Sequence, residues 1–364
     1  FSYLQMVLGY LPGYAVIAFV LLPLYYRLQL TSIYGYLGDR FGRNSYLTGA
    51  WFFLLSRSLG SAARLYLVAE VLQFLVFKQM GVPFVVTVVV TIALIWVYTR
   101  KGGIRTIIWT DTFQTLFMLV AVGLTVVLLG QKLGWSIGEL ITQVHESPLS
   151  RVFFFDDPKP GTYFWKQFLG GMFIAIAMTG LDQDMMQKNL SCRNIGEAQK
   201  NMVSFSLVLV FVNLVFLSLG ALLFLYVERF GVEMPLKPDQ LYPMLATDGS
   251  LPVVVGLHVI MSIVMVILIL LFKVWNDDSV IKTVFRVAGY TYGPLLGLFA
   301  FGMLTKTAVH DRWVPLIAVL SPIITFVLDT YSIQLFGGYK FGFELLLVNG
   351  AITMVGLALL SRRG

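Results

Sequence analysis

The chain has 364 residues, of which 58% are hydrophobic and only 12% are charged, and its mean hydropathy is +0.81. Soluble domains carry roughly one-quarter charged residues, so this composition excludes an ordinary soluble domain and indicates a polytopic membrane protein. The formal net charge of +7 does not indicate a nucleic acid partner, because the Lys and Arg residues lie in short loops between apolar runs and not on one basic face.

About ten apolar segments follow one another along the chain, each long enough to cross a hydrocarbon core of roughly 30 Å. Their lengths fit helices and not barrel strands, so we expect an all-α bundle that forms a single transmembrane domain over residues 1–364. The segments comprise residues 4–26, 46–77, 83–99, 104–129, 164–187, 202–227, 251–272, 284–305, 313–336 and 343–361.

The loops after the first, third and fifth segments carry Lys and Arg, which predicts that they are cytoplasmic. If the segments cross the membrane one after another, the basic residues after segment 284–305 and at the C terminus fall on the outside, against the expected cytoplasmic location. One more membrane crossing, missing near residues 251–272, would bring them to the cytoplasmic side. The longest polar connections, near 131–162 and 228–250, are expected to form extramembrane loops or short surface helices. The opening apolar run has neither a basic n-region nor a cleavage site, so we expect no signal peptide and a multi-pass protein of the plasma (inner) membrane.

The sequence offers little that enzymatic chemistry needs. The single cysteine, Cys192, and three widely spaced histidines provide no cysteine or histidine metal site. The chain also lacks GxGxxG, Walker, HExxH and GxSxG motifs, so nucleotide hydrolysis and the familiar hydrolytic mechanisms have no residues to carry them. We therefore expect a protein that is not an enzyme and that has no organic cofactor.

An aspartate, Asp111, stands within the fourth apolar segment. A carboxylate at the centre of a membrane helix costs about 2.5 to 3.5 kcal/mol, so it needs compensation. Helical spacing places Gln114 and Thr115 on its face, and Thr110 precedes it directly. These oxygens are hard ligands of the kind that an alkali cation prefers, as other hard cations do. The alternative is an ion pair with an arginine such as Arg64.

The second apolar segment carries Arg57 and Arg64, which are seven residues apart and share one helical face. Buried positive charges need partners. These two arginines either pair with Asp111, Asp182 or Glu70 as part of the structure, or they face an anionic group of a substrate.

The fifth segment begins with Gly170 and Gly171 and is interrupted at Gly180, just before Asp182 and Gln183. Glycine-interrupted helices in transporters expose backbone carbonyls and helix ends where solutes and ions bind. We therefore predict a discontinuous helix here. The alternative is that the polar residues after Gly180 form only the wet cytoplasmic end of the helix.

The eighth segment contains Pro294, which predicts a kink. Tyr290 and Tyr292 stand close by, where they would close a cavity and act as gating residues. The commoner use of such tyrosines is to anchor a helix at the membrane interface, and that alternative stays open.

Three stretches, "YGYLGDRFGR" (34–43), "GGIRTIIWTDTFQ" (102–114) and "DQDMMQKNLSCRNIGEAQK" (182–200), resemble signature stretches of the sodium:solute symporter family. The resemblance covers nearly the whole chain and is strongest over residues 1–230. It implies a LeuT-type fold of two inverted repeats of five helices, with solute and sodium bound midway across the membrane at broken helices. The family's first core helix is not in the sequence, and its eighth core helix is not found where the parity demands another crossing.

The resemblance also assigns residues to sites. It places Asp111, with Thr110 and Gln114, near a sodium site, and the helical spacing adds Thr115. The positions that face the solute are Ala175, Met178 and Thr179, with Asp182 and Gln183 just below them. Sugar-transporting members carry a lysine where this chain has Leu209, so a hexose is not implied.

The expected function is sodium-coupled symport of a small organic solute (an amino acid, a sugar or a carboxylate) by alternating access. The partners are then Na+, the solute and membrane lipid, with no nucleic acid and with sodium as the only metal, near Asp111. One alternative is a sensor or other transporter-like protein that binds a solute without moving it. Another is a shortened, non-functional chain that lacks two core helices.

Overall fold

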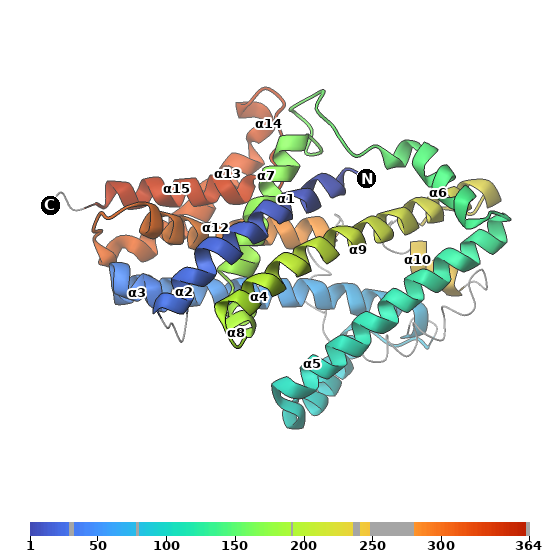
Figure 1. Ribbon diagram of the computed structural model, residues 1–364, viewed down its shortest axis with the longest axis horizontal. Helices are drawn as coiled ribbons and strands as arrows, with labels where there is room; N and C mark the ends of the chain where they lie inside the picture. Colours follow the sequence, from blue (N-terminus) through green and yellow to red (C-terminus); the bar gives the residue numbers. More distant parts are fainter. Residues whose placement is uncertain (29–32, 78–79, 191, 236–240, 248–279, 362–364) are drawn as a thin grey trace. The chain divides into compact units, whose positions relative to one another are not determined.

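A computed structural model describes residues 1–28, 33–77, 80–190, 192–235, 241–247 and 280–361 (Figure 1). For residues 94–114 it describes the backbone but not the side chains. The described chain is almost entirely helical, and its one β contact is an isolated bridge between Val309 and Ser361. The all-α expectation is therefore confirmed for these residues.

The chain divides into two compact units, which are described separately. The first unit comprises residues 1–59, 151–214 and 285–364, and the second comprises residues 60–150 and 215–284. Helices α4 and α9 each begin in the first unit and end in the second.

The first unit contains most of the helices. They are α1 (Tyr3–Val16), a π-helical turn (Ile17–Leu21), α2 (Leu22–Leu28), α3 (Gly35–Phe41), the first half of α4 (Arg43–Leu72), α7 (Phe164–Ala175), a second π-helical turn (Ile176–Gly180), α8 (Gln183–Leu190), the first part of α9 (Ile195–Phe230), most of α12 (Val280–Leu304), α13 (Val314–Thr330), α14 (Ser332–Leu335) and α15 (Leu345–Leu359).

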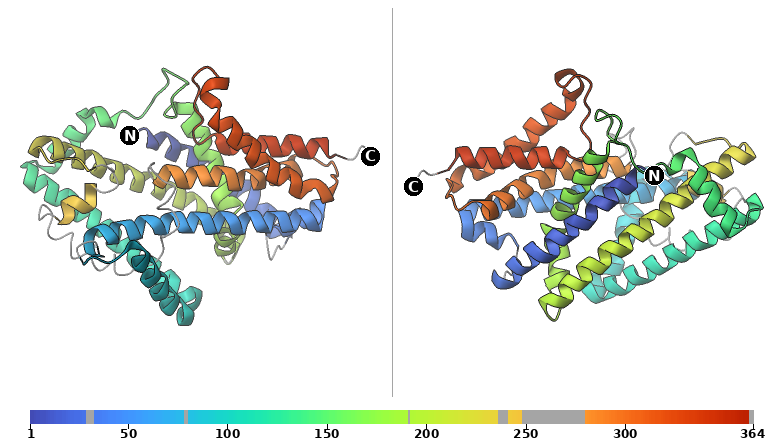
Figure 2. Two further views of the ribbon diagram at one scale, coloured as in Figure 1. Left: turned by 180° about the vertical axis from the view of Figure 1, so that it is seen from behind. Right: turned by 45° about the horizontal axis from the view of Figure 1, so that its top comes forward.

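Helices α1 and α7 cross at very close range, as both views in Figure 2 show. A Cβ atom on Gly9 would lie 2.0 Å from the carbonyl oxygen of Phe168, and one on Gly171 would lie 2.1 Å from that of Met6. In membranes, small residues allow helix backbones to approach closely and so provide the packing contact. Gly171, near the start of the discontinuous helix that the sequence predicts, therefore serves helix packing.

Helix α12 is the most enclosed of the long apolar helices. In its most apolar stretch 72% of the residues are buried, against 22% to 50% in the other four candidate spans among the described residues. It packs on α15 through Gly293 and Gly297, where an added Cβ would lie 2.4 to 2.6 Å from atoms of α15. The helix continues through Pro294, which removes one hydrogen bond from that turn, and the kink predicted there stays a prediction.

The second unit contains the rest of α4, a π-helical turn (Gln73–Phe77), α5 (Phe84–Leu133), α6 (Ile137–Glu146), the rest of α9 and α10 (Leu241–Thr247). The sequence predicted two segments, 83–99 and 104–129, with a cytoplasmic loop between them. That prediction was wrong, because α5 is one helix of 50 residues, about 75 Å long at 1.5 Å per residue. Gly102 and Gly103 lower helix propensity but, unlike proline, do not remove a backbone donor.

Helix α6 is a short helix in the polar connection 131–162, as expected. Its start is fixed by a capping box, in which Ser136 accepts a hydrogen bond from the backbone N–H of Glu139 and Glu139 accepts one from Ser136. The hydrogen bond that the backbone N–H of Ser136 donates to the Glu139 carboxylate is the main reason why the pKa of Glu139 lies below its ordinary value.

Five helical stretches of described residues are long and apolar enough to cross a membrane: Tyr3–Leu28, Thr115–Leu133, Ile195–Phe230, Arg286–Leu304 and Asp311–Thr330. Two shorter apolar stretches occur as well, Phe84–Ala93 at the start of α5 and Leu345–Leu359, which is α15. The segment 251–272, where the sequence predicts a missing crossing, lies outside the described residues.

Candidate functional site

The predicted discontinuous helix is confirmed. Helix α7 ends at Ala175 in a π-helical turn, Ile176–Gly180, and α8 begins at Gln183. A π-helical turn disturbs the regular hydrogen bonding of a helix and often occurs at functional sites. Backbone groups at the break must therefore find other partners.

Two tyrosines that lie far away in the sequence provide those partners. The hydroxyl of Tyr25 donates to the carbonyl oxygen of Gly180 at 3.0 Å, and that of Tyr34 donates to the carbonyl oxygen of Leu181 at 2.9 Å. The side-chain oxygen of Gln183 accepts the backbone N–H of Ile33 at 2.9 Å. The break is thus held from outside by α2 and by the chain that enters α3.

Asp182 lies in the break and is 0% exposed. Its Oδ1 atom accepts the backbone N–H of Met185 at 3.0 Å, which caps the N terminus of α8. Its Oδ2 atom accepts the hydroxyl of Tyr292 at 2.8 Å and lies 3.4 Å from Nε of Arg57. A buried carboxylate is costly unless it is paired and hydrogen-bonded, and here it is both. Asp182 is therefore not part of a wet helix end, whereas Lys188 is exposed.

The two arginines of α4 have different environments. Arg57 lies in the first unit, and its side chain, 27% exposed, pairs with Asp182, one of the three acidic partners that the sequence suggested. Arg64 lies in the second unit with an exposed side chain, and its suggested pairing with Asp111 falls on a side chain outside the described set.

The predicted solute-facing residues precede the break. Ala175 is buried against Gly13 of α1. Met178 and Thr179 are half-buried in the π-helical turn, and the hydroxyl of Thr179 lies 3.4 Å from that of Tyr14. Met178 and Thr179 thus lie in the turn that directly precedes Asp182, whereas Ala175 ends α7 and packs against α1.

The two tyrosines of α12 have different partners. Tyr292 donates to Asp182 of the break, whereas Tyr290 donates to Asp329 of α13 at 2.7 Å, and Nε of Arg286 lies 3.8 Å from the same carboxylate. Each tyrosine therefore bonds a carboxylate that also faces an arginine.

The predicted sodium ligands fall mostly outside the described side chains. Thr110, Asp111 and Gln114 belong to α5, of which only the backbone is described there, and Thr115 is exposed. The assignment of these four residues to Na+ stays a prediction.

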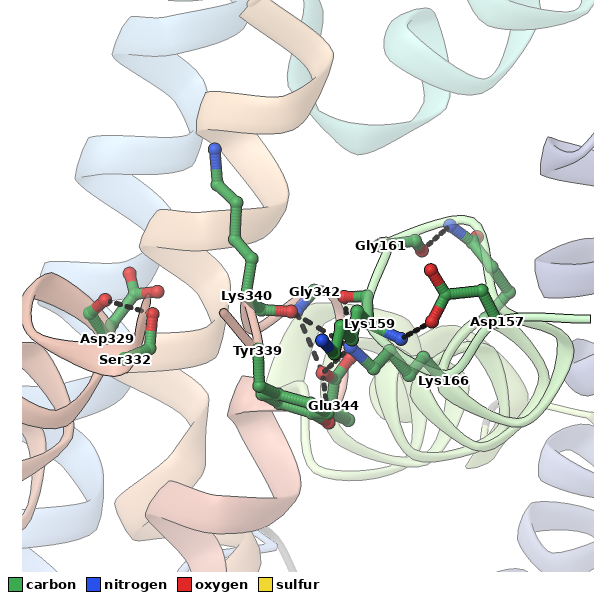
Figure 3. A network of polar contacts seen from close by, with 11 residues as sticks. Asp157, Lys159, Gly161, Lys166, Asp329, Ser332, Tyr339, Lys340, Gly342 and Glu344 are labelled. Atoms are coloured by element: carbon green, nitrogen blue, oxygen red, sulfur yellow. Dashed lines mark hydrogen bonds and ion pairs between the residues drawn. The ribbon is translucent and has the colours of Figure 1, made fainter. Parts of the chain in front are cut away.

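A second buried charge lies at the other end of α7 (Figure 3). Lys166, in the first turn, is 6% exposed, and its ammonium group donates to the carbonyl oxygens of Lys159 at 2.9 Å and Lys340 at 3.0 Å. The ring centroid of Tyr339 lies 3.4 Å from Nζ, and Oε1 of Glu344 lies 4.0 Å away. This cluster could not be predicted from the sequence, because Lys166 meets partners from two polar loops that share no recognisable pattern.

Comparisons with known proteins agree with the family suggested by the signature stretches. Residues 1–257 match the model of the sodium:solute symporter family. The human sodium/iodide cotransporter is 28% identical over 263 residues, which are 70% of this chain and 40% of that protein. The multivitamin transporter of Oryctolagus cuniculus, described as sodium-dependent, is 28% identical over 64% of this chain and 35% of its own length. The human sodium-coupled monocarboxylate transporter 2 is 27% identical over 71% of this chain and 42% of its own length.

The chain thus spans less than half the length of these curated relatives. A solved structure of a Na+-coupled sialic acid symporter, in a substrate-bound outward-open state, matches with a TM-score of 0.70 at 19% identity. The match covers 99% of this chain and 85% of that one. At this identity the likeness shows the fold, which confirms the expected transporter architecture.

Proposed function

This chain belongs to the sodium:solute symporter family, and from that premise we propose that it moves a small organic solute across the plasma membrane together with Na+, by alternating access. Its family and relatives are transporters and not enzymes, and sodium is the ion that they couple to transport. What we propose is the class of solute, the residues that bind the solute and Na+, and the alternating-access cycle.

The observation that carries the proposal is the buried carboxylate of Asp182 in a broken helix. Side chains from α4 and α12 hold it, through Arg57 and Tyr292. Contacts between side chains on different helices can separate and re-form when those helices move. We assign the solute to the turn formed by Ala175, Met178 and Thr179, with Asp182 and Gln183 as the contact that must rearrange during each cycle.

We assign the coupling Na+ to the neighbourhood of Asp111, with Thr110, Gln114 and Thr115. Carboxylate, hydroxyl and amide oxygens suit a hard monovalent cation. The ion offsets the dehydration of a carboxylate placed in an apolar helix, which supports a role beyond structure.

For the solute we propose a small monocarboxylate. Two of the relatives are named for anions, iodide and monocarboxylates, and Leu209 stands where the sugar-transporting members carry lysine. The charge of such a solute decides how sodium can drive it. One Na+ with one monoanion is electroneutral, so only the sodium gradient contributes, about 1.4 kcal/mol per tenfold. A second Na+ would add about 2.3 kcal/mol per 100 mV, and the cycle would then carry current.

The test is uptake into proteoliposomes that contain the complete transporter. Radiolabelled acetate, lactate and pyruvate are compared with proline and glucose, under an inward sodium gradient and under an equal choline gradient. We expect at least one monocarboxylate to accumulate only with sodium, and Asp111→Asn to raise the sodium concentration for half-maximal uptake about tenfold or more, because a charged ligand is lost.

Accumulation of proline or glucose alone would contradict the proposed solute class but not symport. Solute binding without sodium-driven uptake or counterflow would contradict transport and favour a sensor. An unchanged sodium requirement in Asp111→Asn would contradict the assigned ion site.

A further inference from the structure

Helix α12 contains a backbone carbonyl that the helix itself cannot satisfy. Pro294 has no N–H to donate to the carbonyl oxygen of Tyr290, four residues earlier, and the proline ring crowds that oxygen. The turn is buried, so water is a poor substitute partner. The oxygen therefore needs a donor from another element.

Asn349 of α15 is that donor. Its side chain is 0% exposed, and its Nδ2 atom donates to the carbonyl oxygens of Tyr290 and Gly289, each at 3.0 Å. Both hydrogens of the amide are thus used on one turn of α12. The approach is possible because residue 293 is glycine: a Cβ there would lie 2.4 Å from the side chain of Asn349.

Hydroxyl groups of α13 and α15 lie at the oxygen end of this amide. The hydroxyl of Ser321 contacts two acceptors of Asn349, the side-chain oxygen and, at 2.7 Å, the backbone carbonyl oxygen. The hydroxyl of Thr353 lies 2.8 Å from that of Ser321 and 3.0 Å from the same backbone carbonyl oxygen. All three side chains are 0% exposed. The amide nitrogen is therefore directed at α12, and the network ties α12, α13 and α15 together at one level.

The turn that Asn349 holds also carries Tyr292, whose hydroxyl donates to Asp182. Tyr292 is two residues after Tyr290, whose carbonyl oxygen Pro294 leaves without a helical donor, so the rotation of this turn sets where the hydroxyl of Tyr292 lies. We propose that Asn349 is a positioning residue of the transport site, which acts through Tyr292 on the carboxylate in the broken helix. The inference rests on the proposed role of Asp182 in the transport cycle.

The test uses the complete transporter and the sodium-driven uptake of acetate, lactate and pyruvate, expressed per folded protein. If Asn349 acts through Tyr292, Asn349→Ala and Tyr292→Phe lower the maximal rate by similar factors, roughly fivefold, and the double variant is no slower than the slower single one. Pro294→Ala, which returns a backbone N–H to the carbonyl of Tyr290, restores much of the rate of Asn349→Ala. A purely structural role would not give this rescue together with this non-additivity.

Thr325→Val is the matched control. Thr325 is also 0% exposed, but its hydroxyl donates to the carbonyl oxygen of Ser321 in its own helix. Its loss should leave the rate unchanged. Should Asn349→Ala fail to fold, Thr353→Val removes a hydroxyl of the orienting network and should be about twofold slower than Thr325→Val.

Four results would overturn the inference. If Tyr292→Phe leaves the rate unchanged, the proposed role of Asp182 fails with it. If Tyr292→Phe slows uptake but Asn349→Ala does not, or the two effects multiply, the positioning role alone fails. Equal rates for Thr353→Val and Thr325→Val would overturn it in the same way.

Discussion

The two ends of α7 bury opposite charges, and they do so with different kinds of partner. Lys166 stands in the first turn, where the helix dipole disfavours a cation, and Asp182 follows the last turn, where the dipole of α7 disfavours an anion. Lys166 is held by backbone carbonyls of Lys159 and Lys340, whereas Asp182 is held largely by the side chains of Arg57 and Tyr292.

This difference suggests what each end does. Backbone carbonyls in two loops cannot be exchanged without moving those loops, so the Lys166 end is suited to fix α7. Side chains on α4 and α12 change partners by rotation, so the Asp182 end is suited to open and close. Removing a charge should therefore impair transport at the Asp182 end and leave transport unchanged at the Lys166 end, although both changes lower stability.

The largest effect on stability is expected when the ion pair between Arg57 and Asp182 is broken. Arg57→Met leaves a fully buried carboxylate without its cation, which costs about 3 to 5 kcal/mol for a buried pair. The double variant Arg57→Met, Asp182→Asn removes both charges and should recover most of this loss. Thermal unfolding of the purified variants checks this, and a double variant as unstable as the sum of the two single ones would show that the groups are not coupled.

Lys166→Met should come next, with a loss of about 2 kcal/mol, because two hydrogen bonds from a charged group to carbonyl oxygens disappear. Thermal unfolding measures the loss, while sodium-driven uptake per folded protein should stay unchanged. Lys340→Met is the control, because Lys340 contributes its backbone carbonyl to the cluster, and it should behave as the parent protein. A strong uptake defect in a stable Lys166→Met would remove the contrast between the two ends.

Tyr34→Phe should have a smaller effect of about 1 kcal/mol, since it removes one neutral hydrogen bond to the carbonyl of Leu181. Tyr25→Phe removes the matching bond to Gly180 one residue earlier. In both variants the backbone amides around the break should exchange hydrogen faster than in the parent protein. The exchange of the amides near Lys166 should stay the same. If exchange becomes faster by the same factor along the whole of α7 in both variants, the two tyrosines do not stabilise the break locally.

The smallest effect is expected at an exposed carboxylate, Glu139 of the capping box. Its pKa is lowered by the hydrogen bonds from Ser136, so its contribution is complete above the ordinary glutamate pKa and is lost as the pH falls through the lower, folded-state pKa. Glu139→Gln should lower the thermal midpoint slightly at neutral pH and not in acid. Scans of both proteins across that pH range measure the difference, and an equal shift at every pH would rule out the charge as the cause.

Part of this site could be predicted from sequence. Gly180 followed by Asp182 indicated a broken helix, and a buried arginine at position 57 required an acidic partner. The prediction of a loop between residues 99 and 104 was wrong, because a charged stretch that contains glycine resembles a loop by composition. The backbone of α5 is helical there.

The partners of the break could not be predicted. Tyr25 and Tyr34 reach carbonyls that lie 155 and 147 residues further along the chain, and helical periodicity carries no information about such contacts. Tyr34 did lie in a signature stretch, which was the one available signal. Asn349 looked like an ordinary polar residue in an apolar helix, because its role depends on a proline in another helix.

The most direct measurement compares two carboxylates that have the same kind of partners. Asp182 and Asp329 each accept a tyrosine hydroxyl of α12 and each face an arginine, but only the first lies in the broken helix. In proteoliposomes, Asp182→Asn should lower the maximal sodium-driven uptake of a monocarboxylate about tenfold or more per folded transporter, while Asp329→Asn should stay within about twofold of the parent protein. Equal rates for the two variants would contradict the account.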